Sequence, residues 1–253
     1  MRISLLGIEF DALTLDELCA AVSDLMSLGE STIIAHHNLH SIYLFHNDPQ
    51  MRKFYSAAHK IHIDGMPLIY LARIFGYPIR PEHRVTYLDL LWPLMAESAR
   101  QRWRVFYLGG RPGVAEQAAQ RLHQALPELQ LKTHHGYFKK VGQENTDILE
   151  MIRCFRPNVL MVGMGMPLQE HWILENFAQI DADTILTAGA CFDYIAGAIP
   201  SPPRWMGRVG IEWLFRLANE PQRLWRRYLL EPWYVLGLIL RELLRWKFWS
   251  RRD

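Results

Sequence analysis

The chain has 253 residues, of which 50% are hydrophobic, 12% aromatic and 21% charged. This length and composition suit one domain, or one domain with an appendage, and exclude a disordered, collagen-like or short-period repeat protein. The net charge of +2 is unevenly distributed, because residues 204–253 carry 11 Lys or Arg against 5 Asp or Glu, together with six of the nine tryptophans. That basic, Trp-rich end suits an anionic membrane surface.

Short β-rich apolar runs alternate with amphipathic helical patterns up to about residue 200. This alternation predicts an α/β fold, a Rossmann-like layered and mostly parallel sheet. Because ligands of such sheets bind outside the carboxyl ends of the strands, we expect the functional site at those ends. In chain order, the predicted strands are residues 3–8, 32–36, 60–63, 104–108, 130–133, 159–162 and 184–187.

Polar and glycine residues follow most of these strands. Asp64 lies before Gly65 and Pro67, where a carboxylate is either a helix N-cap or a general base. The turn that begins at Gly109 and Gly110 is either a phosphate-binding loop or an ordinary strand-to-helix turn, since it has neither Walker nor Rossmann spacing. Further polar side chains after strands are His36, Asn38, Gln169, Glu170 and Asp193.

Neither a metal site nor a cofactor is expected. The histidine groups at residues 36–40 and 134–135 lack zinc spacing, and the pair Asp181 and Asp183 precedes a strand instead of following one. The cysteines Cys19, Cys154 and Cys191 are too widely spaced for a disulfide framework, which favours a reducing compartment. The N-terminus lacks the pattern of a secretory signal, so the chain is expected to stay in the cytosol.

The prolines at residues 200–203 mark the expected domain boundary. We expect an α/β catalytic domain over residues 1–200 and a basic helical appendage over residues 201–253. The appendage is predicted to form two or three helices, with Pro221 and Pro232 in first turns.

One face of the last predicted helix is apolar. The length of its apolar run indicates whether the helix can span a membrane. The apolar run at residues 233–240 is too short for a membrane span, which needs about 20 residues. The helix therefore either lies on a membrane surface, anchored at its edge by Arg241, Arg245 and Lys247, or docks on the core. The apolar residues at helical spacing are Trp233, Leu236, Leu240, Leu243, Leu244 and Trp246, with Trp249 beyond them.

A series of short motifs runs in order along the chain. They are Asn38; Asp64-Gly65 with Pro67; Arg84-Val85; residues 107–110 with Pro112-Gly113; Gly136-Tyr137-Phe138; residues 165–170; Phe192-Asp193 with Ala196-Gly197; and residues 212–216 with 220–223. With these motifs the sequence resembles the WecG/TagA/CpsF family of bacterial glycosyltransferases over nearly the whole chain.

The resemblance implies an inverting, metal-independent transfer of a sugar from a UDP-sugar to a polyprenyl-diphosphate-linked sugar. The enzyme would be peripheral at the cytoplasmic face of the bacterial inner membrane and would serve exopolysaccharide, antigen or teichoic-acid precursor assembly. Asp64 would be the general base, with Arg84 and Gln169 beside it in the active site. The implied substrate-binding residues are His36, Asn38, Gly109, Gly110, Tyr137, Asp193, Arg216, Arg223 and Arg226, of which the arginines would stabilise the departing diphosphate.

This chain departs from the family pattern at His36, Tyr87 and Ser201, where Thr, Gly and Arg are usual. The donor is therefore open between N-acetylmannosamine and a hexose such as glucose. The alternative function is a non-catalytic nucleotide-binding scaffold of a membrane polysaccharide assembly complex. A nucleic-acid partner is disfavoured because the α/β body is net acidic. The oligomeric state is open, a homo-oligomer included.

Overall fold

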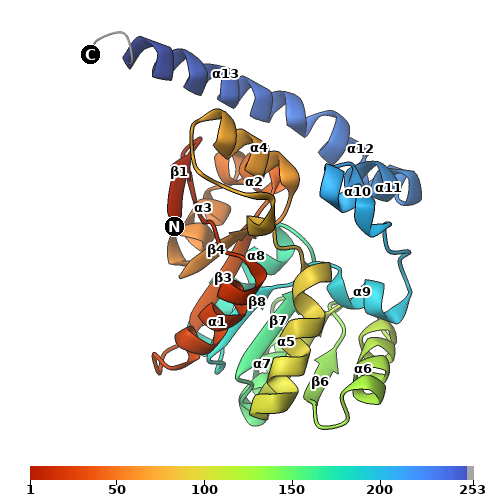
Figure 1. The fold of residues 1–253 in the computed structure, drawn as a ribbon. Helices are drawn as coiled ribbons and strands as arrows, with labels where there is room; N and C mark the ends of the chain where they lie inside the picture. Colours follow the sequence, from red (N-terminus) through yellow and green to blue (C-terminus); the bar gives the residue numbers. More distant parts are fainter. Residues whose placement is uncertain (250–253) are drawn as a thin grey trace.

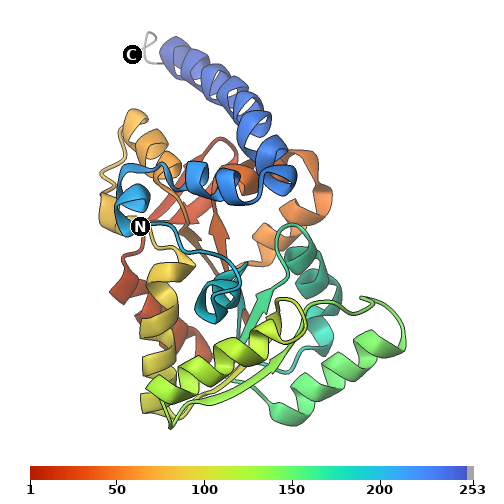
Figure 2. The same cartoon turned by 90° about the vertical axis from the view of Figure 1, so that its right-hand side faces the viewer.

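The computed structural model describes residues 1–249, with the side chains of all of these except Arg204, Arg208 and residues 245–249. A six-stranded parallel sheet carries helices on both faces, and the C-terminal helices lie beyond one edge of it (Figure 1). Turned by 90°, the molecule again shows the last helix projecting beyond the rest of the chain (Figure 2). The predicted α/β fold with a helical C-terminal segment is confirmed.

The sheet has the strand order β4-β3-β8-β7-β5-β6, and all neighbours are parallel. Successive side chains alternate between two cores: Phe106 and Leu108 belong to one, Val105 and Tyr107 to the other. Because all strands run in one direction, their carboxyl ends meet at one edge. The strands agree with prediction to within a residue at each end: β3 (Thr32–His37), β4 (Lys60–Ile63), β5 (Arg104–Gly109), β6 (Gln130–His134), β7 (Val159–Gly163) and β8 (Thr184–Thr187).

The prediction of one strand over residues 3–8 is wrong. Those residues belong to an antiparallel hairpin of β1 (Arg2–Leu5) and β2 (Ile8–Asp11), which forms a separate two-stranded sheet. Leu6 and Gly7 have φ angles of +53° and +75°, and two successive left-handed residues turn the chain back at once. The hairpin is tied to β4, since the Asp11 carboxylate accepts a hydrogen bond from the Ile61 amide at 2.9 Å.

Helices cover both faces of the sheet, and the two cores lie between them and the strands. One face carries α2 (Leu39–Asn47), α3 (Pro49–Ala57), α4 (Met66–Ile74), α7 (Gln143–Phe155) and α8 (Leu168–Asn176). The other carries α1 (Leu15–Met26), α5 (Tyr87–Gln101), α6 (Val114–Ala125) and α9 (Cys191–Ala196). The 3₁₀ turns η1 (Pro81–His83) and η2 (Phe177–Gln179) complete the body.

The described part of the appendage has four helices, where two or three were predicted. They are α10 (Arg204–Val209), α11 (Glu212–Asn219), α12 (Pro221–Leu229) and α13 (Glu231–Trp249). Gly210, with φ +78°, ends α10, and Glu220, with φ −133° and ψ 55°, separates α11 from α12. Pro221 begins α12 and Pro232 lies in the first turn of α13, as predicted.

Helix α13 has two apolar sides. Val235 is buried, and Leu238 and Ile239 pack against the core beside α2. The opposite side exposes Trp233, Leu236, Leu240 and Leu244. Docking on the body is therefore confirmed for one side of this helix, whereas docking of the exposed side on a membrane stays a prediction.

The predictions for the side chains of Arg245, Trp246, Lys247 and Trp249 lie outside the described residues. Nowhere in residues 1–249 does a helix combine the length and the apolar content that crossing a bilayer requires.

Candidate active site

A cavity of about 1030 Å³ lies at the carboxyl edge of the sheet, between the loops after the strands and helices α11 and α12. Both the α/β body and the appendage contribute side chains to it. It brings together nine of the twelve predicted site residues, while Gly109, Arg84 and Arg226 lie outside its lining. Those that line it are His36, Asn38, Asp64, Gly110, Tyr137, Gln169, Asp193, Arg216 and Arg223.

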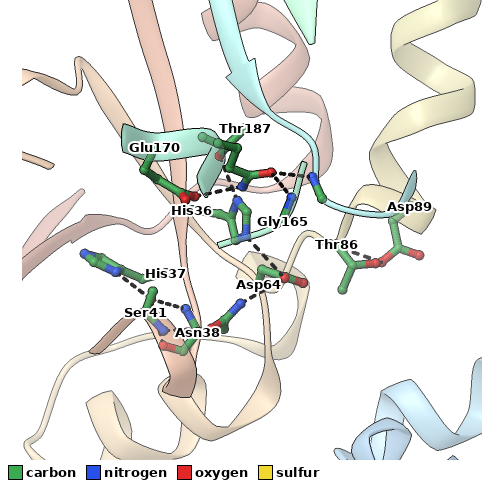
Figure 3. A network of polar contacts seen from close by, with 12 residues as sticks. His36, His37, Asn38, Ser41, Asp64, Thr86, Asp89, Gly165, Glu170 and Thr187 are labelled. Carbon is green, nitrogen blue, oxygen red and sulfur yellow. Dashed lines mark hydrogen bonds and ion pairs between the residues drawn. The ribbon is translucent and has the colours of Figure 1, made fainter. Parts of the chain in front are cut away.

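Asp64 follows β4 directly and lies beside the end of β3 (Figure 3). Its Oδ2 lies 3.8 Å from His36 Nε2 and accepts a hydrogen bond of 3.4 Å from the Asn38 amide. Both contacts use Oδ2, and Asp64 lines the cavity. The N-cap of α4 is Gly65, with φ +146°, so Asp64 is not the helix cap.

His36, His62 and Tyr87 form a buried ring cluster beneath Asp64. The ring centroids lie 5.4 to 5.6 Å apart, and His36 Nδ1 is 3.0 Å from the Thr187 hydroxyl. Neither ring nitrogen of His62 has a hydrogen-bond partner among the described residues. Burial lowers the pKa of His36 and lowers that of His62 to about 3. Both rings are therefore neutral at neutral pH, and the contact between His36 and Asp64 joins an uncharged imidazole to a carboxylate.

The charge of Asp64 is set by its neighbours. Burial favours the neutral acid, but positive charge at His36, His62, Arg84 and Arg216 outweighs burial and lowers the pKa of Asp64 below its usual value. Because the two histidines are neutral near pH 7, arginines are the charges that act there, with Arg84, Arg216 and Arg227 among them. Asp64 is thus an ionised carboxylate in a partly enclosed cavity, which is the state that a general base requires.

Gln169 holds two loops of the cavity together. Its Oε1 accepts hydrogen bonds from the amides of Gly165 and Gly189, at 3.1 and 3.2 Å, which come from the loops after β7 and β8. Its Nε2 donates to Glu170 Oε1 at 2.7 Å. Glu170 is fully buried, its Oε2 has no partner among the described residues, and burial raises its pKa to about 7.

Glycines let the loops approach one another under the cavity. A Cβ on Gly109 would lie 2.3 Å from the carbonyl oxygen of Gly163. The Gly110 carbonyl accepts a hydrogen bond of 2.9 Å from the Gly136 amide. Gly109 therefore supports the floor, whereas Gly110 lines the cavity and Tyr137 stands exposed at its rim.

The predicted arginines differ in their surroundings. Arg84 pairs with Asp89 at 3.5 Å and with Glu212 of α11 at 3.2 Å, so it links the body to the appendage. Arg216 and Arg223 line the cavity. Arg226 is exposed and stacks over Trp225, with 5.2 Å from its guanidinium carbon to the ring centroid.

The sequence reasoning missed Arg227, which lines the cavity from the same helix as Arg223. Its spacing from the predicted Arg223 could have indicated it, since residues four apart share a face of a helix. It also missed Glu212 and Thr187, whose partners come from distant parts of the chain.

The acidic pair Asp181 and Asp183 does not line the cavity. Asp183 precedes β8, at the opposite edge of the sheet, where it accepts a hydrogen bond from Asn158 at 2.8 Å. Within residues 1–249, His, Cys, Asp and Glu do not gather into a group of three suited to a metal ion. Asp193 lines the cavity, and burial raises its pKa.

Comparison with known proteins confirms the family resemblance over nearly the whole chain. The family model described as "Glycosyl transferase WecG/TagA/CpsF family" matches residues 3–248. Similar proteins occur in Staphylococcus aureus strains MW2 and NCTC 8325, each named N-acetylglucosaminyldiphosphoundecaprenol N-acetyl-beta-D-mannosaminyltransferase. Each is 23% identical to this chain over 236 residues, which cover 89% of this chain and 87% of the relative.

Proposed function

The chain belongs to the WecG/TagA/CpsF glycosyltransferase family, and from that premise we propose that it moves a sugar from a UDP-sugar to a polyprenyl-diphosphate-linked sugar with inversion. The observation that carries the proposal is the cavity in which an ionised Asp64 and the guanidinium of Arg216 lie together. The names of the Staphylococcus aureus relatives support a lipid-diphosphate-linked acceptor.

The proposed reaction is a single displacement. The acceptor hydroxyl gives its proton to Asp64 while its oxygen forms a bond to the anomeric carbon of the donor sugar. The bond between that carbon and the β-phosphate oxygen breaks, and UDP leaves with the electron pair. Attack from the face opposite UDP inverts the anomeric carbon, and the protonated Asp64 then releases its proton to water.

Positive side chains stabilise the departing diphosphate in this proposal. Arg216 and Arg223 line the cavity and provide charge-assisted hydrogen bonds to phosphate oxygens as negative charge develops on them. We propose that these arginines replace a divalent cation. The division into a catalytic domain over residues 1–200 and an appendage over residues 201–253 is part of the same proposal.

The location of the enzyme follows from its substrate and from α13. We propose that it is peripheral at the cytoplasmic face of the bacterial inner membrane, where it acts in the assembly of cell-envelope glycan precursors. The exposed apolar side of α13, with Trp233, Leu236 and Leu240, supports docking on an anionic lipid surface.

The test is release of UDP from a panel of UDP-sugars mixed with a short-chain lipid-diphosphate-sugar acceptor. The panel includes UDP-N-acetylmannosamine and UDP-glucose, because the donor sugar is the open point. One donor should be consumed only with acceptor present. Asp64→Asn should keep its fold and its affinity for UDP but lose roughly 10²- to 10⁴-fold in turnover, the usual contribution of a general base.

Asp24→Asn, at an exposed position of α1, is the matched control and should keep the wild-type rate. An Asp64→Asn enzyme with most of the wild-type rate contradicts the assigned base. UDP binding without transfer by the wild type, across the whole panel, favours the scaffold alternative instead.

A further inference from the structure

Arg227 and Arg216 present two guanidiniums to one cavity. Both side chains are partly buried, and the Nε atom of each lacks a hydrogen-bond partner among the described residues. Among the described residues, neither Arg216 nor Arg227 forms an ion pair with a carboxylate. The cavity therefore holds two positive charges whose counter-charge the described side chains do not supply by direct contact.

Such an arrangement suits a ligand with more than one negative charge. Burial and the nearby charge of Arg216 lower the pKa of Arg227, which reflects the cost of holding two cations together. A diphosphate removes that cost, because its oxygens accept bidentate hydrogen bonds from guanidinium groups.

Arg227 and Arg223 act on different charged groups. Arg223 lies one helical turn earlier on α12 and acts electrostatically on Asp193, which follows β8. Arg227 acts instead on Asp64, on His40 of α2 and on Glu231, the first residue of α13. Glu231 accepts a hydrogen bond from His40 at 2.6 Å, which fixes the start of α13 beside Arg227.

Arg227 therefore acts both on the carboxylate of Asp64 and on the first residue of α13, the helix with an exposed apolar side. In a lipid-linked acceptor the diphosphate likewise lies between the other two parts, since the reacting hydroxyl and the diphosphate belong to one sugar and the lipid follows the diphosphate. We propose that Arg227 binds the diphosphate of the lipid-linked acceptor, which leaves Arg223 to the diphosphate of the donor. This inference rests on the proposed function.

Direct binding tests it without the need for turnover. The probes are a farnesyl-diphosphate-linked N-acetylglucosamine, octyl N-acetylglucosaminide as the same sugar without diphosphate, and UDP, each titrated by calorimetry. Arg227→Ala should weaken binding of the diphosphate probe at least tenfold and leave the affinities for UDP and for the octyl glycoside within twofold. Arg227→Lys should recover part of the loss, because it keeps the charge but not the planar fork.

Two further variants complete the experiment. Arg153→Ala, on the exposed side of α7, is the charge control and should bind every probe as the wild type does. Arg226→Ala tests the neighbouring arginine named by the family resemblance. If Arg226→Ala weakens the diphosphate probe and Arg227→Ala does not, the inference is wrong.

Loss of UDP affinity in Arg227→Ala, with the acceptor probe unaffected, also overturns the inference, because it moves Arg227 to the donor. The two proposals fail separately. Full activity of Asp64→Asn contradicts the proposed mechanism and leaves the binding result standing, whereas wild-type affinity of Arg227→Ala for every probe contradicts only the role of Arg227.

Discussion

At the scale of single residues, the protonation of the site is controlled by burial as much as by charge. Asp64 keeps its charge because arginines lie near it, whereas Glu170 of α8 is held towards its neutral form because it is fully buried. His62 pairs in register with His36 across β3 and β4, and both rings stay neutral. The same cavity edge thus holds an ionised Asp64, two neutral histidines and a Glu170 that gives up its proton only near pH 7.

Glu170 gives a prediction about stability and pH. Its pKa is about 7 in the folded chain, against an ordinary value of 4.5. Between pH 4.5 and about pH 7, the folded chain therefore keeps a proton on Glu170 that the unfolded chain has released. Stability therefore falls as pH rises from about 4.5 to about 7, by about 3 kcal/mol in total. Glu170→Gln removes this loss. It should be more stable than the wild type at about pH 8 and nearly equal to it at about pH 4.5.

Urea unfolding of both proteins at the two pH values measures the effect. Equal pH dependence in the two proteins would show that Glu170 ionises in the folded chain as it does in the unfolded one.

At the scale of elements, two polar pairs among the described residues link the appendage to the body, in addition to apolar packing. Glu231 of α13 binds His40 of α2, and Glu212 of α11 binds Arg84 at the start of the α5 region. The second contact is tightly packed, since a Cβ on Gly207 of α10 would lie 2.8 Å from the Arg84 guanidinium. Arg84 therefore positions α11, and with it Arg216, over Asp64.

The pair of Arg84 and Glu212 should behave as a unit. Arg84→Ala and Glu212→Gln should each lower kcat/KM, because each removes the ion pair that holds α11 above Asp64. The double variant should lose less than the product of the two single losses, with a coupling energy of roughly 0.5–3 kcal/mol. Steady-state kinetics of the four proteins gives the coupling. The exposed pair of Glu97 and Arg100 serves as the control cycle, and purely additive effects at Arg84 and Glu212 would contradict the link.

At the scale of the whole molecule, the two sides of α13 differ in what covers them, and only the exposed side carries the proposed membrane contact. Val235, Leu238 and Ile239 hold the helix on the body, and Trp233, Leu236, Leu240 and Leu244 remain exposed. Deleting the helix would also uncover the face of α2 on which it packs, so point substitutions on the exposed side separate membrane docking from folding.

The double variant Leu236→Asp/Leu240→Asp should sediment with anionic vesicles at least about tenfold less than the wild type, because two apolar contacts with lipid are lost. Its melting temperature should stay near that of the wild type, since both side chains are exposed. Leu28→Asp, at an exposed apolar position after α1, is the control. Unchanged sedimentation of the double variant would mean that another surface meets the membrane.

Local sequence patterns were sufficient to predict most of the sheet and the location of the candidate site. Six strands of the sheet were predicted to within a residue because short β-rich apolar runs between turns are a local signal. The placement of the site at the strand ends followed from the geometry common to parallel sheets, which brought Asp64, Asn38 and Asp193 into one cavity. Resemblance to a family added the reaction, which no pattern of hydrophobicity contains.

Other features depend on packing between segments far apart in the chain. Leu6 turns the first predicted strand into a hairpin through an unusual φ angle, which the apolar pattern does not encode. Arg84 pairs with a residue 128 positions away, and α12 turns Arg227 into the cavity while Arg226 faces solvent. Side-chain type and spacing name the groups that can do chemistry, but which of them meet depends on contacts that only the folded chain creates.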